Sequence, residues 1–497
     1  MNAPALQAPD VRSCRVTTLC LHGARAVPVE IELQYTGGLM QRIVMTGLPG
    51  HALRESRDRI RGCLERCGLP VPRKSVLANF APADLHKEGN GFDLPLAIGI
   101  LALAGLVPPE ALAGRAILGE VALDGRLRPV RGALLAAMEA RRLGLASVLL
   151  PQENGGEARL VGGLRVEAVA SLPEALAVLS GLPAPHVPEL TPLVAPQLDL
   201  ADVRGQGAAR RALEIAAAGR HNLLLTGPPG TGKTMLAQRL PGILPPLDQA
   251  SALEVTALHG LRTVPAGIVG HPPFRAPHHT VSRAGLIGGG SPLVPGEVSL
   301  AHAGVLFLDE LPEFPRSLLE ALRQPLEERA VRLARAAATI TFPADFRLVG
   351  AMNPCPCGYL GHPRRGCQCT PFQVQTYRQR ISGPLLDRLD LCIEVPVPLA
   401  RDLLDGPVAE GSAAVAARVA AARAVPRAPR ELPADAAVRT RLENAIGTFA
   451  LSGRSVRRLV EVARTIAALD GRGEAQRDDI DEALALRLPL LNFTEPA

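Results

Sequence analysis

Aromatic residues are scarce in this sequence. It has no tryptophan, three tyrosines and ten phenylalanines among 497 residues. A partner such as single-stranded nucleic acid could therefore not be held mainly by stacking of its bases on aromatic rings, and contact with its phosphates is the mode that remains. The formal charge of +6 and the pI near 9.0 permit a polyanionic partner but are too small a surplus to require one. Any such site must be local.

Long hydrophobic runs are also missing. The longest, "LPLAIGILALAGLV" at 94–107, is shorter than the roughly 20 residues that span a bilayer, so it predicts a buried helix. The first residues, "MNAPALQAPDVRSCRV", lack a basic region followed by an apolar run, so we expect no secretory signal. The nine cysteines are an odd number, which argues against a disulfide framework. We expect a cytoplasmic protein without a membrane partner.

Two proline-rich stretches, "SGLPAPHVPELTPLVAPQLDL" and "RAVPRAPRELPADA", divide the chain, because repeated prolines oppose continuous helices and strands. We expect an α/β domain at 1–180, a linker at 181–200, a second α/β domain at 201–399, a linker at 400–433 and a small all-helical domain at 434–497. The α/β assignments rest on apolar strand-like runs that alternate with helical Ala/Leu-rich runs.

A nucleotide-binding motif opens the second domain. "HNLLLTGPPGTGKTMLAQRL" contains an apolar strand, a glycine-rich turn and an amphipathic helix, the context that a phosphate-binding loop requires. The loop comprises Gly227, Pro228, Pro229, Gly230, Thr231, Gly232, Lys233 and Thr234. Its glycines let backbone N–H groups surround phosphates, Lys233 can reach the β and γ oxygens, and Thr234 can bind magnesium. We expect ATP and Mg²⁺ here.

An acidic pair follows an apolar strand in "GVLFLDELPEF". Four apolar residues are typical of a buried parallel strand, and Asp309 and Glu310 come directly after them. Downstream of a phosphate loop, Asp309 can hold the magnesium, and Glu310 can polarise the water that attacks the γ-phosphate. The sequence therefore predicts an ATPase.

Four cysteines lie in "NPCPCGYLGHPRRGCQC", within the segment 353–370. Cys355, Cys357, Cys367 and Cys369 form two Cys-x-Cys pairs, and His362 is a spare ligand candidate. Four thiolates suit tetrahedral zinc in a structural site, because four protein ligands leave no open position for water. The alternative is a group of small inert thiols.

The phosphate loop, the acidic strand, "AMNP" and "SGPLLDRLDL", in this order, resemble an AAA+ ATPase of the magnesium-chelatase clade. The long motifs "FRAPHHTVSRAGLIGGGSPLVPGEVSLAHAGVLFLDELPEF" and "NPCPCG" narrow the resemblance to the ComM/YifB family. These are bacterial proteins linked to natural transformation, and their ComM members are hexameric DNA helicases that promote branch migration. The resemblance covers nearly the whole chain. It implies a P-loop AAA+ core at 201–399 and a helical lid at 434–497.

The resemblance also assigns three residues at the ATP site. Asn353 matches the polar sensor that positions the attacking water. Arg388 matches the arginine finger that reaches the neighbouring subunit's ATP, which implies a ring of subunits, with Arg380 as a rival. Arg454 matches the sensor arginine of the lid, with Arg457 one helical turn away as the alternative.

Two segments, 274–290 and 327–343, fall where this clade carries hairpins. Their basic residues suit contact with DNA phosphates regardless of base sequence. The candidates are Arg275, His278, His279 and Arg283 in the first segment, and Arg329, Arg332 and Arg335 in the second. Metal binding or loop packing is the alternative for the two histidines.

The domain at 1–180 resembles a Lon protease domain, most visibly in "KEGNGFDLPLAIGILALAGLV". At the positions of the serine nucleophile and lysine base stand Asp93 and Leu134, so no proteolysis is expected. Cys63 and Cys67, spaced by four residues, are interpreted as inert thiols, with metal binding as the alternative.

The ATP-site motifs predict an ATPase. The resemblance to the ComM/YifB family implies that it is a ring motor, a helicase or translocase acting on single-stranded or branched DNA during transformation or recombination. The alternative is a remodelling ATPase that acts on a protein client and does not respond to DNA.

Overall fold

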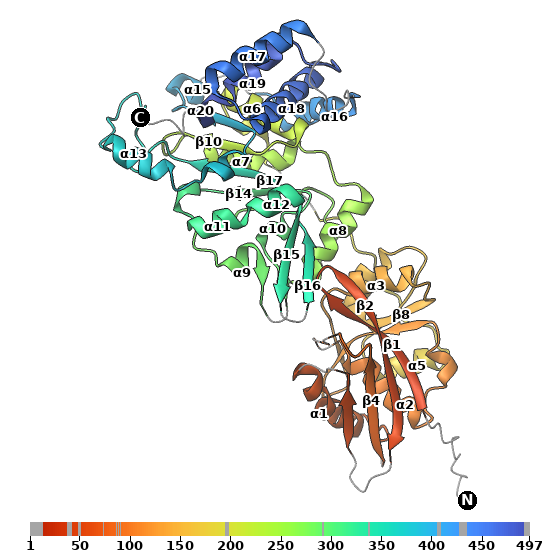
Figure 1. The fold of residues 1–497 in the computed structure, drawn as a ribbon. Helices are drawn as coiled ribbons and strands as arrows, with labels where there is room; N and C mark the ends of the chain where they lie inside the picture. The colour runs from red at the N-terminus through yellow and green to blue at the C-terminus, as the bar shows by residue number, and fades with distance from the viewer. Residues whose placement is uncertain are drawn as a thin grey trace, which may run out of the picture.

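The computed structural model describes residues 13–36, 42–47, 51–72, 74–85, 87, 89, 91–193, 198–290, 293–335, 338–404, 409–426 and 435–491. Figure 1 shows an elongated arrangement, with the N-terminal α/β domain at one end, a second α/β domain in the middle and a group of helices at the other end. Within the described residues, no helix is both long enough and apolar enough to cross a membrane.

The N-terminal domain is built on a seven-stranded mixed sheet in the order β3-β4-β2-β1-β5-β8-β9. Its strands are β1 (Ser13–His22), β2 (Arg25–Thr36), β3 (Ile43–Thr46), β4 (Ser75–Ala81), β5 (Arg115–Ile117), β8 (Ser147–Pro151) and β9 (Arg165–Val169), and β6 (Glu120–Val121) and β7 (Leu127–Arg128) form a small separate hairpin. Strands β1, β2 and β4 pair antiparallel, whereas β5, β8 and β9 run parallel.

The helices of this domain are α1 (His51–Arg66), α2 (Asp93–Leu103), α3 (Ala133–Arg142), α4 (Gln152–Arg159) and α5 (Leu172–Leu179), with a 3-10 turn, η1 (Pro109–Ala111). All eleven residues of α2 are buried. The apolar run that contains α2 is therefore a buried helix, as predicted, because a helix that is apolar all round needs protein on every side.

The middle domain has a five-stranded sheet in the order β11-β14-β17-β10-β18, and every pair in it is parallel. The strands are β10 (Leu223–Thr226), β11 (Phe274–Arg275), β14 (Val305–Leu308), β17 (Arg347–Met352) and β18 (Leu391–Glu394). The central three are entirely buried, as their continuous apolar sequences predict. Their carboxyl ends lie at one edge of the sheet, where ligands bind in open α/β folds.

The helices around this sheet are α6 (Gly207–Gly219), α7 (Lys233–Arg239), α8 (Gln249–Gly260), α9 (Arg283–Leu286), α10 (Glu297–Leu300), α11 (Arg316–Ala321), α12 (Arg323–Glu328), α13 (Pro371–Arg378) and α14 (Gly383–Leu386), with 3-10 turns η2 (Leu200–Asp202), η3 (Leu240–Ile243) and η4 (Leu311–Glu313). Two hairpins leave the domain, β12 (Gly288–Gly289) with β13 (Val294–Pro295), and β15 (Ala330–Arg335) with β16 (Ala338–Pro343). The second confirms the hairpin expected within 327–343.

The C-terminal helices are α15 (Ala400–Leu404), α16 (Ser412–Ala424), α17 (Ala436–Phe449), α18 (Gly453–Leu469), α19 (Arg477–Ala485) and α20 (Leu488–Leu491). Residues 400–433 were expected to be a linker, but they hold α15 and α16. Helix α16 packs on α6 and α18 through Val415, Val419 and Ala422. The proline-rich sequence that suggested a linker begins only at the end of α16, and the alanine-rich part before it has helical spacing.

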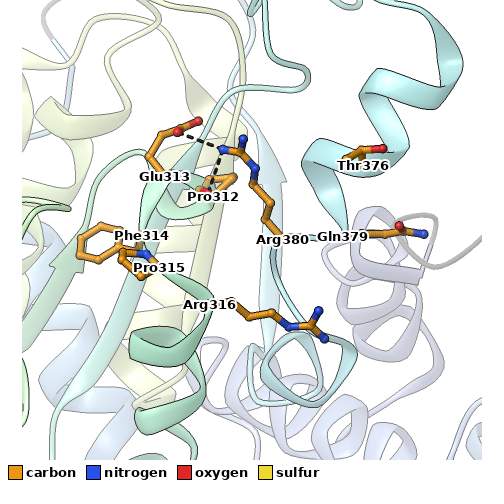
Figure 2. Close-up of a pocket in the computed structure, with 8 residues that line it drawn as sticks. All are labelled: Pro312, Glu313, Phe314, Pro315, Arg316, Thr376, Gln379 and Arg380. Atoms are coloured by element: carbon orange, nitrogen blue, oxygen red, sulfur yellow. Dashed lines mark hydrogen bonds and ion pairs between the residues drawn. The ribbon is translucent and has the colours of Figure 1, made fainter. Parts of the chain in front are cut away.

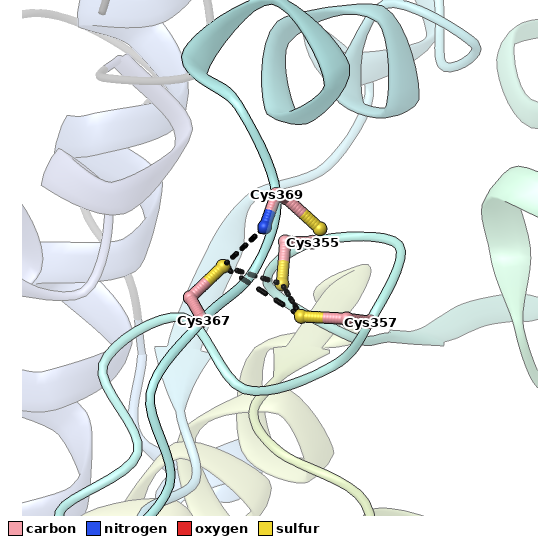
Figure 3. A group of neighbouring side chains, drawn as sticks. All are labelled: Cys355, Cys357, Cys367 and Cys369. Atoms are coloured by element: carbon pink, nitrogen blue, oxygen red, sulfur yellow. Dashed lines mark hydrogen bonds between the residues drawn. The ribbon is translucent and has the colours of Figure 1, made fainter.

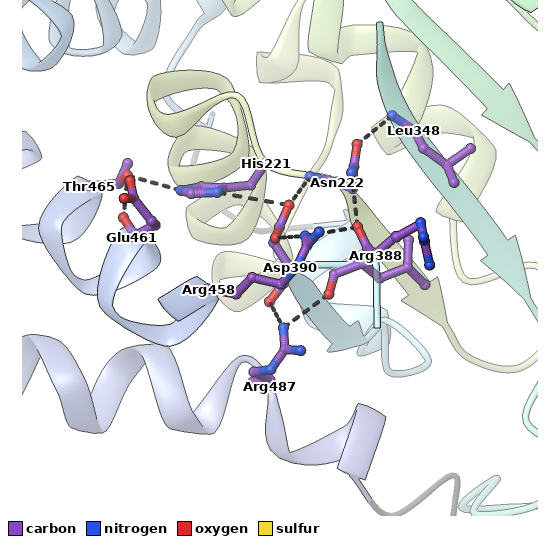
Figure 4. A network of polar contacts seen from close by, with 10 residues as sticks. His221, Asn222, Leu348, Arg388, Asp390, Arg458, Glu461, Thr465 and Arg487 are labelled. Atoms are coloured by element: carbon purple, nitrogen blue, oxygen red, sulfur yellow. Dashed lines mark hydrogen bonds and ion pairs between the residues drawn. The ribbon is translucent and has the colours of Figure 1, made fainter. Parts of the chain in front are cut away.

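A polar network joins these helices to the middle domain (Figure 4). Asp390, just before β18, accepts hydrogen bonds from the backbone N–H of Asn222 at 2.8 Å and from the guanidinium of Arg458 on α18. Arg487 donates to the carbonyl of Asp390 at 3.2 Å, and His221 bonds Thr465 at 2.9 Å. The start of the central strands is thus tied to the helical lid.

Candidate nucleotide site and metal clip

The phosphate loop lies between β10 and α7, as predicted. Lys233, at the start of α7, is buried, and its ammonium donates to the carbonyls of Gly227 at 2.7 Å and Pro228 at 2.9 Å and to Oδ1 of Asn353 at 3.2 Å. Burial lowers the pKa of Lys233. Glycine is required at Gly230 and Gly232, because both have positive φ angles, of 77° and 89°.

Thr234 and Asp309 face each other across this edge of the sheet. Thr234 Oγ1 donates to Asp309 Oδ2 at 2.7 Å. A hydroxyl and a carboxylate this close, beside a phosphate loop, are oxygen donors of the kind that magnesium takes, so the residues fit the expected ion. The carboxyl ends of β10, β14 and β17 bring together Lys233, Asp309 and Asn353, which are far apart in the sequence.

Glu310 follows Asp309 in a left-handed backbone conformation, with φ of 51°, and its N–H donates to Asp309 Oδ1 at 2.9 Å. Non-glycine residues adopt this conformation rarely, and it is concentrated at functional sites. The carboxylate is largely exposed, and its Oε2 lies 3.5 Å from Nδ1 of His279. An exposed carboxylate next to the phosphate loop is suited to polarising a water molecule.

The four cysteines converge in the loop that leaves β17 (Figure 3). The sulfur of Cys355 lies 3.4 Å from that of Cys357 and 3.6 Å from that of Cys367, and all four sulfurs lie within 4.8 Å of one another. Tetrahedral zinc, with Zn–S bonds of about 2.3 Å, separates its sulfurs by about 3.8 Å, and a disulfide would bring them to about 2.0 Å. The cysteines therefore match a metal site in donor type, number and spacing. We call residues 355–369 the clip.

Other atoms around the clip support this geometry. The N–H of Leu360 points to the sulfur of Cys355 at 3.4 Å, and the N–H of Cys369 to that of Cys367 at 3.4 Å. Hydrogen bonding by backbone N–H groups, first that of Tyr359, lowers the pKa of Cys357 to about 6. Nδ1 of His362, the spare ligand candidate, accepts hydrogen bonds from the backbone N–H groups of Arg364 at 3.1 Å and Arg365 at 3.0 Å.

Comparisons with known proteins agree with this architecture. A family model described as magnesium chelatase, subunit ChlI, matches residues 199–403. A second model, for subunit ChlI of Mg-chelatase, matches 31–154, and a third, for the C-terminal part of subunit ChlI, matches 409–487. YifB of Salmonella typhimurium is 42% identical over 498 residues, covering 95% of this chain and 96% of that protein. Competence protein ComM of Haemophilus influenzae is 41% identical over 497 residues, covering 94% and 95%. The chain belongs to the ComM/YifB family of magnesium-chelatase-like AAA+ proteins.

The fold class expected for this family is confirmed, with an α/β N-terminal domain, a parallel α/β core and a helical C-terminal region. Lon protease homolog 2, peroxisomal, of Caenorhabditis elegans is 33% identical over 147 residues, which are 29% of this chain and 18% of that protein. Asp93, at the expected nucleophile position, is fully buried and accepts hydrogen bonds from Ser56, from Arg59 at 3.0 and 3.1 Å and from the N–H of Val121 at 3.3 Å. Burial raises its pKa.

Leu134, at the expected position of the lysine base, is a fully buried apolar side chain. With Asp93 already bonded on all sides, these positions supply neither nucleophile nor base. The sulfur atoms of Cys63 and Cys67 lie 4.0 Å apart, and burial raises the pKa of the Cys63 thiol to about 12. Within the described residues, this pair has no third cysteine, histidine or carboxylate placed to share a metal ion, which agrees with its interpretation as inert thiols.

Two arginines assigned by resemblance to the ComM/YifB family meet at one carboxylate. Arg388 is buried and forms an ion pair with Glu327 of α12, and Arg454 of α18 lies 3.4 Å from the same Glu327 oxygen. Arg457 is exposed. The pKa of Arg388 is lowered mainly by burial. The positive charges of nearby Arg323, Arg454 and Arg458 lower it further. The lid and the core thus each contribute an arginine to Glu327.

Arg380, the rival finger, lies in a different place. Its half-exposed guanidinium bonds Glu313 at 3.0 Å and the carbonyl of Pro312 at 3.4 Å. With Arg316, Thr376 and Gln379 it lines a polar pocket of about 470 Å³ next to η4 (Figure 2). Both candidate fingers are therefore held by carboxylates of their own subunit.

The DNA candidates separate into two groups. Arg283 on α9 and Arg332 on β15 are exposed and line one groove of about 480 Å³, which Glu320 of α11 also lines, and Arg332 lies 3.2 Å from Glu328. Arg275 bonds Glu297 at 2.6 Å, and Arg329 lies 3.7 Å from Asp345. His278 is exposed and bonds Thr280 at 2.9 Å, whereas His279 contacts Glu310. The side chain of Arg335 lies outside the described residues.

Sequence reasoning missed Gln206. It sits in a left-handed conformation before α6, and its amide donates to the carbonyls of Pro396 at 2.7 Å and Thr231 at 3.4 Å. Its buried Oε1 has no partner within the described residues. A lone glutamine between glycines gives no signal in the sequence, because the contact depends on how β18 leaves the sheet beside the loop.

Proposed function

We propose that this protein is an ATP-driven motor that acts on DNA, as a helicase or translocase in a homo-oligomeric ring, most simply a hexamer. The observation that carries the proposal is the link between Glu310 and the segment that follows β11. His279 in that segment contacts Glu310, and Arg283 in the same segment lines the groove that it shares with Arg332. DNA bound at the groove could therefore shift this segment, and with it the position of the Glu310 carboxylate.

The steps at the ATP site follow from the residues present. The loop N–H groups and Lys233 bind the phosphates, Thr234 and Asp309 hold Mg²⁺, and Glu310 polarises the attacking water while Asn353 orients it. An arginine from the neighbouring subunit stabilises charge on the transferred phosphoryl group. The family match to AAA+ proteins supports this assignment.

For DNA, the support is the groove between Arg283 and Arg332 and the 41% identity to competence protein ComM. Arginines on two separate segments suit a phosphate backbone, because such contact does not depend on base sequence. We propose that branch migration of DNA taken up or recombined by the cell is the activity served. The clip holds zinc as a structural metal in this proposal.

One alternative is favoured by a specific observation. The family models that match three parts of the chain are named after a magnesium chelatase subunit. A remodelling ATPase of that type acts on a protein client, and its ATPase would not respond to DNA.

The steady-state ATPase rate separates the two functions. It is measured with and without single-stranded and forked DNA, with Glu310→Gln as the hydrolysis-dead control. Strong stimulation by DNA that disappears in Glu310→Gln supports the motor. An unchanged rate, together with no DNA binding at low salt, overturns the DNA function and leaves the protein-client alternative.

A further inference from the structure

The clip lies directly against the phosphate loop. A Cβ added at Gly358 would lie 2.8 Å from both Cδ and Cγ of Pro229 and 3.8 Å from Cγ of Asn353. Real Cβ atoms do not approach neighbours within 3.0 Å, so the backbone of the clip already touches the loop that would hold the phosphates. The clip is therefore a neighbour of the ATP site as well as a separate metal site.

The clip also begins at the ATP site. Only Pro354 separates Asn353, whose side chain bonds Lys233 at 3.2 Å, from Cys355. Cys355 is fully buried, and its carbonyl accepts from the N–H of Gly358 at 3.0 Å. Cys355 and Gly358 thus close a tight turn that begins two residues after Asn353, so we expect a displacement of the cysteine to move the amide as well.

The far end of the clip returns to the same point. Cys369 leads into α13, whose N-terminus is capped by Thr370. Tyr377 in that helix is buried, and the backbone of Asn353 lies close enough to its hydroxyl to influence the pKa of that hydroxyl. The chain therefore leaves Asn353, passes through four cysteines and comes back to it. Between the two cysteine pairs, most residues from 360 to 366 are exposed, so this excursion has little apolar core of its own.

We propose that zinc in the clip is a positioning element for the phosphate loop and Asn353, so that zinc binding and nucleotide binding are thermodynamically linked. The inference rests on the ATP site and the zinc site proposed above. Four zinc–thiolate bonds fix an excursion that its side chains alone do not hold. Linkage is reciprocal, so a nucleotide that needs the fixed loop must also tighten the binding of zinc.

The first test uses two glycines of the clip with matched backbone strain. Gly358 and Gly361 both have positive φ, of 84° and 77°, but a Cβ at Gly361 meets nothing within 4 Å. Gly358→Ala and Gly361→Ala are compared for zinc content by mass spectrometry and for affinity toward a fluorescent ADP analogue. We expect Gly358→Ala to weaken nucleotide binding at least about tenfold relative to Gly361→Ala, because small displacements of a phosphate loop are costly. Equal affinities in the two variants overturn the linkage.

The second test uses the wild-type chain. The distribution of zinc between the protein and a chromogenic chelator is measured at equilibrium in excess magnesium, with and without ADP, and in Lys233→Ala as the control that binds nucleotide poorly. A larger share of zinc kept by the wild type with ADP, but not by Lys233→Ala, supports the linkage. An equal share with and without ADP overturns it, as does a purified protein without bound metal.

These readouts do not depend on hydrolysis or on DNA. A protein that binds ADP and protects its zinc but shows no DNA-stimulated ATPase contradicts the proposed motor and leaves the linkage intact. The converse result, DNA-stimulated hydrolysis with no effect of ADP on zinc binding, overturns the linkage alone.

Discussion

Nδ1 of His279 lies 3.5 Å from Oε2 of Glu310. The ring of His279 also packs against that of His278, with centroids 4.0 Å apart, and meets the ring of Phe314 edge-on at 6.3 Å. The histidine is therefore held on two sides while its nitrogen faces the carboxylate. It connects the segment that carries Arg283 to the residue proposed to activate water.

The first prediction concerns this contact. His279→Ala is expected to lower the kcat of ATP hydrolysis about tenfold with little change in nucleotide affinity, because the carboxylate of Glu310 loses the group that orients it. DNA should stimulate the variant less than the wild type. His271→Ala, which alters a histidine earlier in the same connection, is the control for ATPase kinetics. A kcat for His279→Ala equal to that of the control would show that the contact does not orient Glu310.

The second prediction concerns the groove between Arg283 and Arg332. Arg283→Glu with Arg332→Glu should weaken DNA binding at every base sequence and reduce the slope of log affinity against log salt by about one for each phosphate that no longer pairs with an arginine. The control is Arg57→Glu with Arg61→Glu, an equal charge change on the exposed face of α1. Fluorescence anisotropy of labelled DNA over a salt series measures both. Equal slopes in the two double variants would locate the DNA elsewhere.

The third prediction concerns the shared carboxylate Glu327. Because Arg388 and Arg454 both pair with it, the effects of Arg388→Ala and Arg454→Ala on the ATPase rate should be non-additive. Arg457→Ala, one helical turn from Arg454, is the control and should combine additively with Arg388→Ala. A double-mutant cycle on kcat/KM measures the coupling. Additivity in both pairs would mean that the two arginines act independently.

Mixing of subunits identifies the finger itself. Arg388→Ala subunits keep Glu310, and Glu310→Gln subunits keep Arg388, so a mixed ring should regain ATPase activity at the shared sites. The same experiment with Arg380→Ala tests the rival. Restoration with Arg380→Ala and not with Arg388→Ala would assign the finger to Arg380.

The fourth prediction concerns pH. Glu157 of α4 is 1% exposed, next to Gly260 of the middle domain, and burial raises its pKa from 4.5 to about 7. Between pH 4.5 and about 7 the folded state therefore keeps a proton on Glu157 that the unfolded state has lost. The contribution of this carboxyl group to the free energy of unfolding is fully present below pH 4.5 and is lost as the pH rises to about 7. Glutamine in Glu157→Gln has no proton to lose in this range. The free energy of unfolding of the variant should therefore fall less steeply with pH than that of the wild type, by up to about 1.4 kcal/mol per pH unit. Thermal unfolding of both proteins from pH 5 to 8 measures the difference, and parallel curves would contradict the prediction.

Much of the ATP site could be predicted from the sequence, because each part has a local signature. Glycines before Lys233 and Thr234, and a short apolar run before Asp309 and Glu310, specify a loop and a strand without reference to the rest of the chain. The four cysteines were recognisable as candidate ligands for the same reason, because two Cys-x-Cys pairs lie within 15 residues. The helices within 400–433 were missed because nearby prolines outweighed an alanine-rich helical pattern.

The sequence by itself determined which chemical groups are available for nucleotide, magnesium and zinc, because those groups lie in short contiguous motifs. Tertiary structure alone decided which of them meet. His279 reaches Glu310 because β11 and β14 are neighbours, and Gly358 touches Pro229 because β17 lies beside β10. Arg388 and Arg454 share Glu327 because the lid packs on the core. Such contacts depend on the order of strands and on the docking of helices, which no local pattern of residues encodes.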